Sequence, residues 1–249
     1  MDCLKIFFNS HPKLAVAFSG GVDSSYLLYA CSKFKIDAKP YYVRTEFQPA
    51  FEFEDALRVC DELNFTLTVV ERNILSDDEI TANGQNRCYR CKLKILDSII
   101  ERARADGYEI IADGNNASDD PSGRPGMKAV EELGVVSPLR ECGLTKEKIR
   151  GLSKEAGLST WDKPAYSCLA TRVAPGRKIT REDLSKIEAA ERLLFERGFT
   201  DFRARVATDG SARLQLPENQ IGKIISERHT LLGELYKLYE TVALDLKGR

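Results

Sequence analysis

The sequence lacks the features that mark membrane, secreted and nucleic-acid-binding proteins. No apolar run approaches the ~20 residues of a membrane-spanning helix. Asp2 and Lys5 leave too short an apolar stretch at the start for a signal peptide, so we expect a cytoplasmic protein. The formal net charge is −1, so no excess of cations indicates a surface for nucleic acid or for an anionic membrane.

The cysteines do not form the even, regularly spaced set that is typical of a disulfide scaffold. There are seven of them, at irregular spacing, so we expect no disulfide framework. Cys31 and Cys60 fall at apolar positions of predicted helices, where a thiol packs as a small core side chain. The cysteines left as candidates for chemistry are Cys88, Cys91, Cys142 and Cys168.

Strand-like and helix-like patterns alternate over most of the chain, which predicts an α/β fold with a parallel sheet covered on both faces. The predicted strands are 14–18, 39–44, 65–70, 109–112 and 135–139. A linker near Pro175 and Gly176 separates a large domain, 1–174, from a small α+β domain, 175–249. In the small domain we expect a helix capped by Thr180, a hairpin of 202–207 with 212–216, and helices over 218–246.

The first predicted strand runs directly into Ser19-Gly20-Gly21-Val22-Asp23-Ser24, which opens a predicted helix. The glycines let a ligand approach the backbone, and N–H groups at the helix start, with the Ser19 and Ser24 hydroxyls, would face an anion. No lysine follows Gly21 as in a Walker A loop, and the third glycine of a Rossmann fingerprint is missing. We predict a phosphate site, with Asp23 positioning phosphate or magnesium.

Further nucleotide contacts are expected where other strands end, because ligands of parallel sheets sit beyond the carboxyl ends of the strands. Arg44 ends the second predicted strand, and a long stretch of turn formers begins at Asp113 after the fourth. Our candidates in these segments are Arg44, Asp113, Gly114, Asn115 and Arg124.

Cys88-x-x-Cys91 stands at the predicted start of a helix, a position that favours thiolate over thiol. Two close thiolates suit a soft metal or an iron–sulfur cluster, and a thiol redox pair is an alternative. A second CxxC is absent, so a local four-cysteine zinc site is excluded. Cys168 would be the third ligand of a 4Fe–4S cluster, whose iron without a protein ligand could bind hydrosulfide and offer it as a nucleophile. Alternatively, Cys168 would attack on its own as a thiolate. Cys142 is an alternative third ligand of the cluster.

The combination of motifs resembles one family. Ser-Gly-Gly-x-Asp-Ser resembles the pyrophosphate loop, or PP-loop, of ATP pyrophosphatases, whose domain is adenine nucleotide alpha-hydrolase-like. The wider set looks like the LarE-type ATP-dependent sulfur transferases, on the segments 19–24, 113–115, 124–126, 137–139 and 163–172, with the C-terminal stretches 203–205 and 212–214.

The resemblance implies sulfur insertion into pyridinium-3,5-biscarboxylic acid mononucleotide during nickel-pincer nucleotide biosynthesis. ATP with Mg²⁺ would adenylylate a substrate carboxylate, pyrophosphate would leave, and a sulfur nucleophile would displace AMP, with Asp23 and Cys168 as catalytic residues. One branch of the family sacrifices the cysteine matching Cys168, which becomes dehydroalanine. Cys88 and Cys91 indicate the three-cysteine branch, which uses a 4Fe–4S cluster.

The substrate's phosphate and carboxylates require fixed cations, for which forked guanidinium groups are suited. Our candidates are Arg172, Arg203, Arg205 and Arg213. The resemblance also implies a homo-oligomer and a sulfide donor as partners. The rival hypotheses are a PP-loop tRNA thiolation enzyme, an amide-forming PP-loop ligase and a non-catalytic nucleotide- or metal-sensing module.

Overall fold

The computed structural model describes residues 2–120 and 125–248, so the candidate ATP contact Arg124 lies outside the described residues. The chain divides into two compact units, 1–73 with 86–165, and 74–85 with 166–249. The structural division after Ala165 precedes the expected limit between 174 and 175 and joins a short internal segment to the second unit. The domain limits 1–174 and 175–249 stay a prediction.

The first unit is built on a four-stranded parallel sheet, which confirms the predicted α/β fold. The strand order is β3-β2-β1-β4. The strands are β1 (Lys13–Ala17), β2 (Asp37–Arg44), β3 (Thr68–Glu71) and β4 (Ile111–Ala112). The main connecting helices are α2 (Val22–Lys33), α3 (Ala50–Glu62) and α5 (Arg87–Ala105). All four carboxyl ends therefore point to one edge, where the loop after β1 opens.

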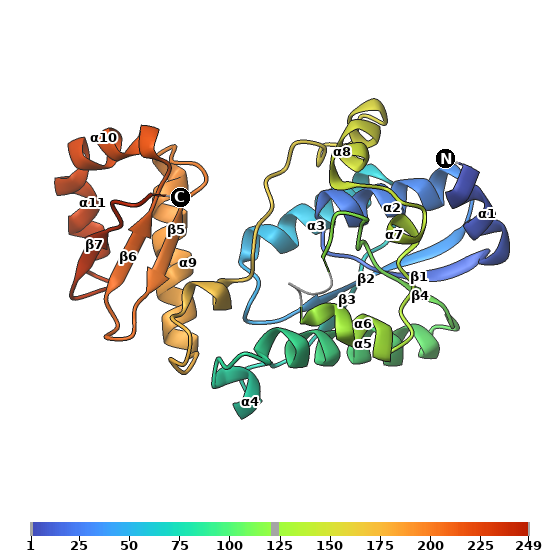
Figure 1. The fold of residues 1–249 in the computed structure, drawn as a ribbon, viewed down its shortest axis with the longest axis horizontal. Helices are drawn as coiled ribbons and strands as arrows, with labels where there is room; N and C mark the ends of the chain where they lie inside the picture. The colour runs from blue at the N-terminus through green and yellow to red at the C-terminus, as the bar shows by residue number, and fades with distance from the viewer. Residues whose placement is uncertain (1, 121–124, 249) are drawn as a thin grey trace. The chain divides into compact units, whose positions relative to one another are not determined.

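Both faces of this sheet are covered by helices (Figure 1). Along β1 the side chains of Leu14 and Val16 join one core cluster while Ala15 joins the other, as the two-residue period of a strand requires. The first cluster packs under α2, α3, α1 (Asp2–Ser10), α7 (Pro138–Glu141) and α8 (Lys146–Glu155). The second packs under α5 and α6 (Gly126–Glu132). Burial on both faces explains why the strands read as continuous apolar runs.

The predicted strand at 135–139 is wrong. Only Val136 pairs there, through an isolated parallel bridge to Ala112, and the chain then turns into α7. Pro138 is the first residue of that helix. Proline has no N–H for a sheet ladder and is pre-set for the first helical position, so it ends the strand pattern at this point.

The second unit contains a three-stranded sheet in the order β5-β6-β7. The predicted hairpin is confirmed: β5 (Arg203–Val206) pairs antiparallel with β6 (Ala212–Gln215). The predicted cap of α9 (Arg181–Glu196) is also confirmed, since the Thr180 side chain accepts a hydrogen bond from Asp183 N. After α10 (Glu218–Ser226) and α11 (Arg228–Leu235), the chain forms β7 (Val242–Leu244) where we expected helix. This strand pairs with β6 in parallel.

The short helix α4 (Asp78–Thr81) belongs to the second unit although it precedes α5 in sequence. Ile179 N donates to Thr81 O at 2.7 Å, and Asn83 Nδ2 donates to Ala174 O at 2.8 Å. These two hydrogen bonds, one from a backbone N–H and one from the Asn83 side chain, tie the small unit to a segment that the sequence pattern left unassigned. Among the described residues, no helix has the length and apolar character that crossing a membrane would require.

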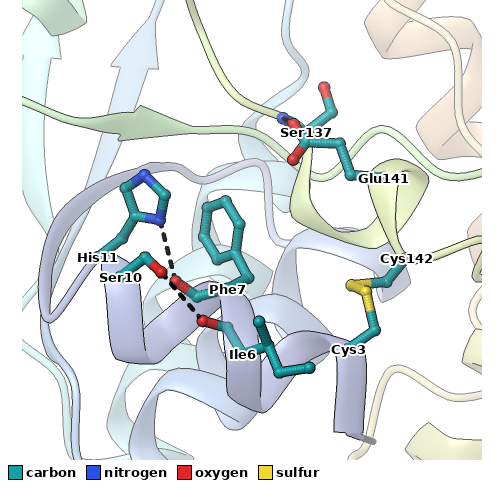
Figure 2. Close-up of a disulfide and its surroundings, with 8 residues drawn as sticks. All are labelled: Cys3, Ile6, Phe7, Ser10, His11, Ser137, Glu141 and Cys142. Atoms are coloured by element: carbon teal, nitrogen blue, oxygen red, sulfur yellow. Dashed lines mark hydrogen bonds between the residues drawn. A yellow bond between two sulfur atoms is a disulfide. The ribbon is translucent and has the colours of Figure 1, made fainter.

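One disulfide is present, although we expected no disulfide framework and kept Cys142 as an alternative cluster ligand. Cys3 of α1 is bonded to Cys142, which follows α7, across 139 residues of sequence (Figure 2). The two helices pack on the same core cluster, which brings their cysteines together. The spacing of cysteines in a sequence carries no information about a contact between two such distant residues. The odd number of cysteines and their irregular spacing were therefore misleading for this pair.

Candidate functional site

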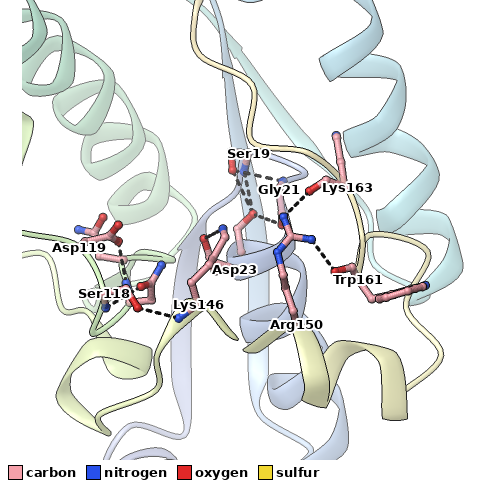
Figure 3. A network of polar contacts seen from close by, with 12 residues as sticks. Ser19, Gly21, Asp23, Ser118, Asp119, Lys146, Arg150, Trp161 and Lys163 are labelled. Atoms are coloured by element: carbon pink, nitrogen blue, oxygen red, sulfur yellow. Dashed lines mark hydrogen bonds and ion pairs between the residues drawn. The ribbon is translucent and has the colours of Figure 1, made fainter. Parts of the chain in front are cut away.

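The loop between β1 and α2 has the geometry of an anion site. Gly20 adopts a φ of +68°, and a Cβ at this position would lie 2.9 Å from Ala56 Cα in α3. Only glycine therefore fits, because a side chain would be strained and would clash with backbone. Ser24 Oγ donates to Gly21 O at 3.2 Å and accepts from Ser19 N at 3.3 Å, so the loop is braced by its own hydroxyl group (Figure 3).

Asp23 lies in the first turn of α2, and only one of its two carboxylate oxygens has a partner in the described part of the chain. Its Oδ2 lies 2.6 Å from Lys146 Nζ, the ammonium of the first residue of α8. Its Oδ1 is buried and has no hydrogen-bond partner within the described part of the chain. Buried polar atoms in native structures are rarely left unpaired. A carboxylate oxygen in this state fits a hard cation such as Mg²⁺.

A second lysine reaches the same loop from another part of the chain. Lys163 Nζ donates to Gly20 O at 3.1 Å and lies 2.7 Å from Asp55 Oδ2 of α3. Arg150 of α8 donates to the carbonyl groups of Trp161 and Lys163, at 2.8 and 2.7 Å. Although burial raises the pKa of Asp55, the hydrogen bonds from Lys163 and a neighbouring arginine hold that pKa below its usual value.

The end of β4 packs directly against this loop. A Cβ on Gly114 would lie 2.8 Å from Ser24 N, so the backbone after β4 touches the start of α2. Asp113 is buried, and it accepts hydrogen bonds from Ser137 Oγ at 2.7 Å and from Asn115 Nδ2 at 2.6 Å. Burial raises the pKa of Asp113, against the lowering effect of the Lys92 charge. The candidates from two distant segments thus meet at one edge of the sheet.

Arg44 lies at the same edge, at the end of β2. Its guanidinium is 3.5 Å from Glu71 of β3 and 4.9 Å from the ring centroid of Phe53 in α3. The side chain is 50% exposed, so it is accessible to a ligand beyond the strand ends. Its role as an ATP contact stays a prediction.

Cys88 and Cys91 stand at the start of α5, as the sequence predicted, as the second and fifth residues of the helix. Three residues apart on a helix, they share one face. Cys88 is exposed and Cys91 partly exposed, and Arg87 Nη2 lies 3.5 Å from Cys88 Sγ. Lys92 follows directly, and its charge acts on Asp113. The start of α5 is thus linked to the nucleotide candidate Asp113 through the charge of Lys92.

Cys168 belongs to the second unit, directly before the short 3₁₀ helix η1 (Leu169–Arg172). It is partly exposed. Arg172 is buried, and its Nη1 donates to Ser167 O at 2.6 Å and to Cys168 O at 3.3 Å. Arg172 Nε is 2.9 Å from Glu191 Oε1 in α9. The guanidinium that we expected to contact substrate thus also holds the backbone that carries Cys168.

The other three candidate arginines gather on the hairpin of the same unit. Arg203 is buried, donates to Phe202 O at 2.6 Å and lies over the ring of Tyr166. Arg205 Nη1 donates to Thr171 O at 2.7 Å. Arg213 is opposite Arg205 in the hairpin register and is 53% exposed. The Arg205 contact ties η1 to the hairpin, and Arg213 is the most exposed of the three hairpin arginines.

The candidate residues are therefore distributed over both units. The PP-loop, Asp113, Gly114 and the CxxC pair lie in the first, while Cys168 and the four arginines lie in the second. Within the described ranges, no group of three or more His, Cys, Asp and Glu side chains forms a ready metal site. The convergence of Cys88, Cys91 and Cys168 stays a prediction. Cys142 is bonded to Cys3 and is not a thiol in this structure.

Lys146 and Lys163 belong to the loop network, although no sequence motif identified them as members. Lys163 stands in the Lys-Pro-Ala segment on which the family resemblance rests, but no spacing rule connected it with Gly20, 143 residues away. Lys146 begins an amphipathic helix, where a lysine is ordinarily a solvated surface charge.

Comparison with known proteins gives the family. No family model matches the chain. An uncharacterised protein of Synechocystis sp. is 34% identical over 100% of this chain and 94% of its own length. The pyridinium-3,5-bisthiocarboxylic acid mononucleotide synthase of Lactiplantibacillus plantarum is 31% identical over 95% of this chain and 86% of its own. A tRNA-specific 2-thiouridylase of a Thermotoga species is more distant, 24% identical over 59% of this chain and 52% of its own.

The match to the mononucleotide synthase extends over both structural units, and the more distant match to the thiouridylase is to a second sulfur-transferring enzyme. Together with the braced Ser-Gly-Gly-x-Asp-Ser loop at the end of β1, they place the chain in the LarE-type family of PP-loop sulfurtransferases.

Proposed function

We propose that the protein is an ATP-dependent sulfurtransferase that converts a carboxylate of pyridinium-3,5-biscarboxylic acid mononucleotide to a thiocarboxylate, for nickel-pincer nucleotide biosynthesis. The observation that carries the proposal is the 31% identity to a synthase whose name gives the bisthiocarboxylic product, over 95% of this chain. The braced loop, the half-satisfied Asp23 and the CxxC pair supply the residue types that this chemistry needs.

In the first step, a substrate carboxylate oxygen bonds to the α-phosphorus of ATP, the α–β bridge breaks, and pyrophosphate leaves with the bridge electrons. The loop amides and hydroxyls of Ser19 and Ser24 would hold the phosphates. The buried Oδ1 of Asp23 fits a bound Mg²⁺, which would neutralise charge on the phosphates. A sulfur nucleophile then bonds to the acyl carbon, and AMP leaves with the C–O electron pair.

For the sulfur source we propose a 4Fe–4S cluster held by Cys88, Cys91 and Cys168. The donor set is compatible, because all three cysteines are outside the disulfide and at least partly exposed, and two of them lie one turn apart at the start of α5. Cys142 is excluded as third ligand in the oxidised form because it is bonded to Cys3. When bound, the cluster would supply a sulfide that attacks the activated carboxyl group.

Mass spectrometry of the intact chain after anaerobic turnover tests both the reaction and the sulfur route. Protein purified without oxygen is mixed with ATP, Mg²⁺, sulfide and the biscarboxylic mononucleotide. We expect AMP, pyrophosphate and a thiocarboxylate product, with Cys168 chemically intact. Loss of the elements of hydrogen sulfide from Cys168 would establish the sacrificial route instead and refute the cluster.

The distant thiouridylase match keeps tRNA thiolation as the second candidate. The net charge of −1 counts against it, because phosphate contacts require an excess of cations. Thiolation of a tRNA in place of the mononucleotide, with a salt-dependent affinity, would select that alternative.

A further inference from the structure

The two lysines at the PP-loop come from segments that lie more than 120 residues after it in the sequence. Lys146 is the first residue of α8, and Lys163 lies in the segment after that helix. Their ammonium groups contact the loop at two different points. Lys146 Nζ contacts Asp23 in the first turn of α2 (Figure 3), and Lys163 Nζ contacts Gly20 O at the turn itself. Side-chain exposures of 34% and 17% show that both are partly withdrawn from solvent but still accessible.

The hydrogen bonds of these ammonium groups are incomplete. An ammonium group has three N–H donors. In the described part of the chain, Lys146 Nζ donates only to Asp23, and Lys163 Nζ contacts Gly20 O and Asp55. Three donors therefore remain on the two groups, beside a loop whose backbone already suits an anion. Ordinary surface salt bridges would not require two lysines to contact the same glycine turn, one at Gly20 and one at Asp23.

The position of Lys163 is itself fixed by α8. Arg150, one turn along the helix from Lys146, donates to the carbonyl groups of Trp161 and Lys163. A forked guanidinium that holds two backbone carbonyls restricts the segment that carries the lysine. Helix α8 thus supplies one lysine directly and orients the other.

We propose that Lys146 and Lys163 bind the β- and γ-phosphates of ATP and the pyrophosphate that leaves, and that Arg150 positions Lys163. The inference rests on the ATP-dependent reaction proposed above. Cleavage between the α- and β-phosphates develops negative charge on the departing pyrophosphate, and fixed cations at that point stabilise it. Asp23 and Asp55 hold the two side chains extended toward the loop before the nucleotide arrives.

The test compares the affinities of ATP and AMP, measured by calorimetry on the full chain with Mg²⁺ present. Lys146→Gln and Lys163→Gln each keep a donor for their protein partner and lose the charge. We expect each to weaken ATP binding on the order of 10- to 100-fold, as for loss of a charge-assisted hydrogen bond, and to leave AMP affinity unchanged. Lys148→Gln, at an exposed position of the same helix, is the matched control and should change neither affinity.

Arg150→Gln should weaken ATP binding as Lys163→Gln does, and the double variant should lose little more, because both changes act on one contact. Equal losses for ATP and AMP would show that the lysines only brace the loop, and unchanged ATP affinity would show that they bind no phosphate; both results overturn the proposal. If Lys163→Gln does not fold, Lys146→Gln decides. Wild-type protein that binds no ATP would instead refute the proposed function.

Discussion

Replacing Arg172 with methionine tests whether this guanidinium supports the Cys168 segment in addition to any contact with substrate. Arg172 is 1% exposed, its Nε lies 2.9 Å from Glu191 Oε1, and its Nη1 donates to two carbonyls, those of Ser167 and Cys168. Removal of one partner from a buried ion pair costs about 3–5 kcal/mol, because the other charge stays buried without a counterion. We expect the free energy of unfolding of the second unit to fall by about that amount.

Urea unfolding of the full chain, followed by circular dichroism, measures this loss. Peptide mapping after brief alkylation adds a local readout, in which Cys168 should react faster once its carbonyl group is released. Arg192→Met is the matched control on the neighbouring helix α9. Its side chain is 72% exposed and 3.9 Å from Glu196, so its stability should change by less than about 0.5 kcal/mol.

A second substitution separates the charge effect from the loss of packing. Adding Glu191→Leu to Arg172→Met removes the stranded carboxylate, so part of the lost stability should return. Recovery should be incomplete, because Glu191 also accepts hydrogen bonds from Ala204 N and Tyr166 Oη. If Arg172→Met unfolds like wild type and loses only substrate affinity, the guanidinium serves the substrate and does not support the Cys168 segment.

Three further outcomes follow from individual contacts. Gly20→Ala should abolish ATP binding and cost at least about 1–2 kcal/mol in thermal unfolding, since a left-handed φ of +68° is strained for alanine; unchanged ATP affinity would contradict the loop geometry. Cys3→Ser should lower the unfolding free energy by at most about 5 kcal/mol under non-reducing conditions and by nothing in dithiothreitol. Burial raises the pKa of Cys31 and Cys60 to about 12, so alkylation at pH ~8 should modify Cys88 and spare both.

The parts of the fold that sequence patterns predicted are those that local residues determine. The apolar run before Ser19, the Thr180 cap and the alternation across the hairpin each specify an element from neighbouring positions. The wrong predictions of secondary structure occur where a tertiary contact determines whether a segment becomes a strand or a helix. Val136 forms a single bridge before Pro138 starts a helix, and β7 becomes a strand because it pairs with β6.

In the candidate site, too, the sequence predicted residues within one motif but not contacts between distant segments. Motif spacing located Ser19 to Ser24 because phosphate loops are contiguous, and Cys88 with Cys91 because two ligands on one helical face need a spacing of three or four. Lys163 and Gly20 are brought together only by the fold, as are Cys3 and Cys142. A single sequence has no signal for a contact between residues that belong to different elements and share no motif.

The environments of the seven cysteines bear on the sulfur chemistry independently of the family. Cys31 and Cys60 are in the core with raised pKa values, where a thiolate is disfavoured, and the disulfide takes up the pair joining α1 and α7. The remaining cysteines are all at least partly exposed: Cys88, Cys91 and Cys168. Two of them occupy a helix start, which stabilises thiolate, and the third has its backbone anchored by a buried arginine. Burial and disulfide pairing thus leave three accessible thiols among the seven cysteines. Three is the number of thiolates that would hold a 4Fe–4S cluster with one iron left without a protein ligand.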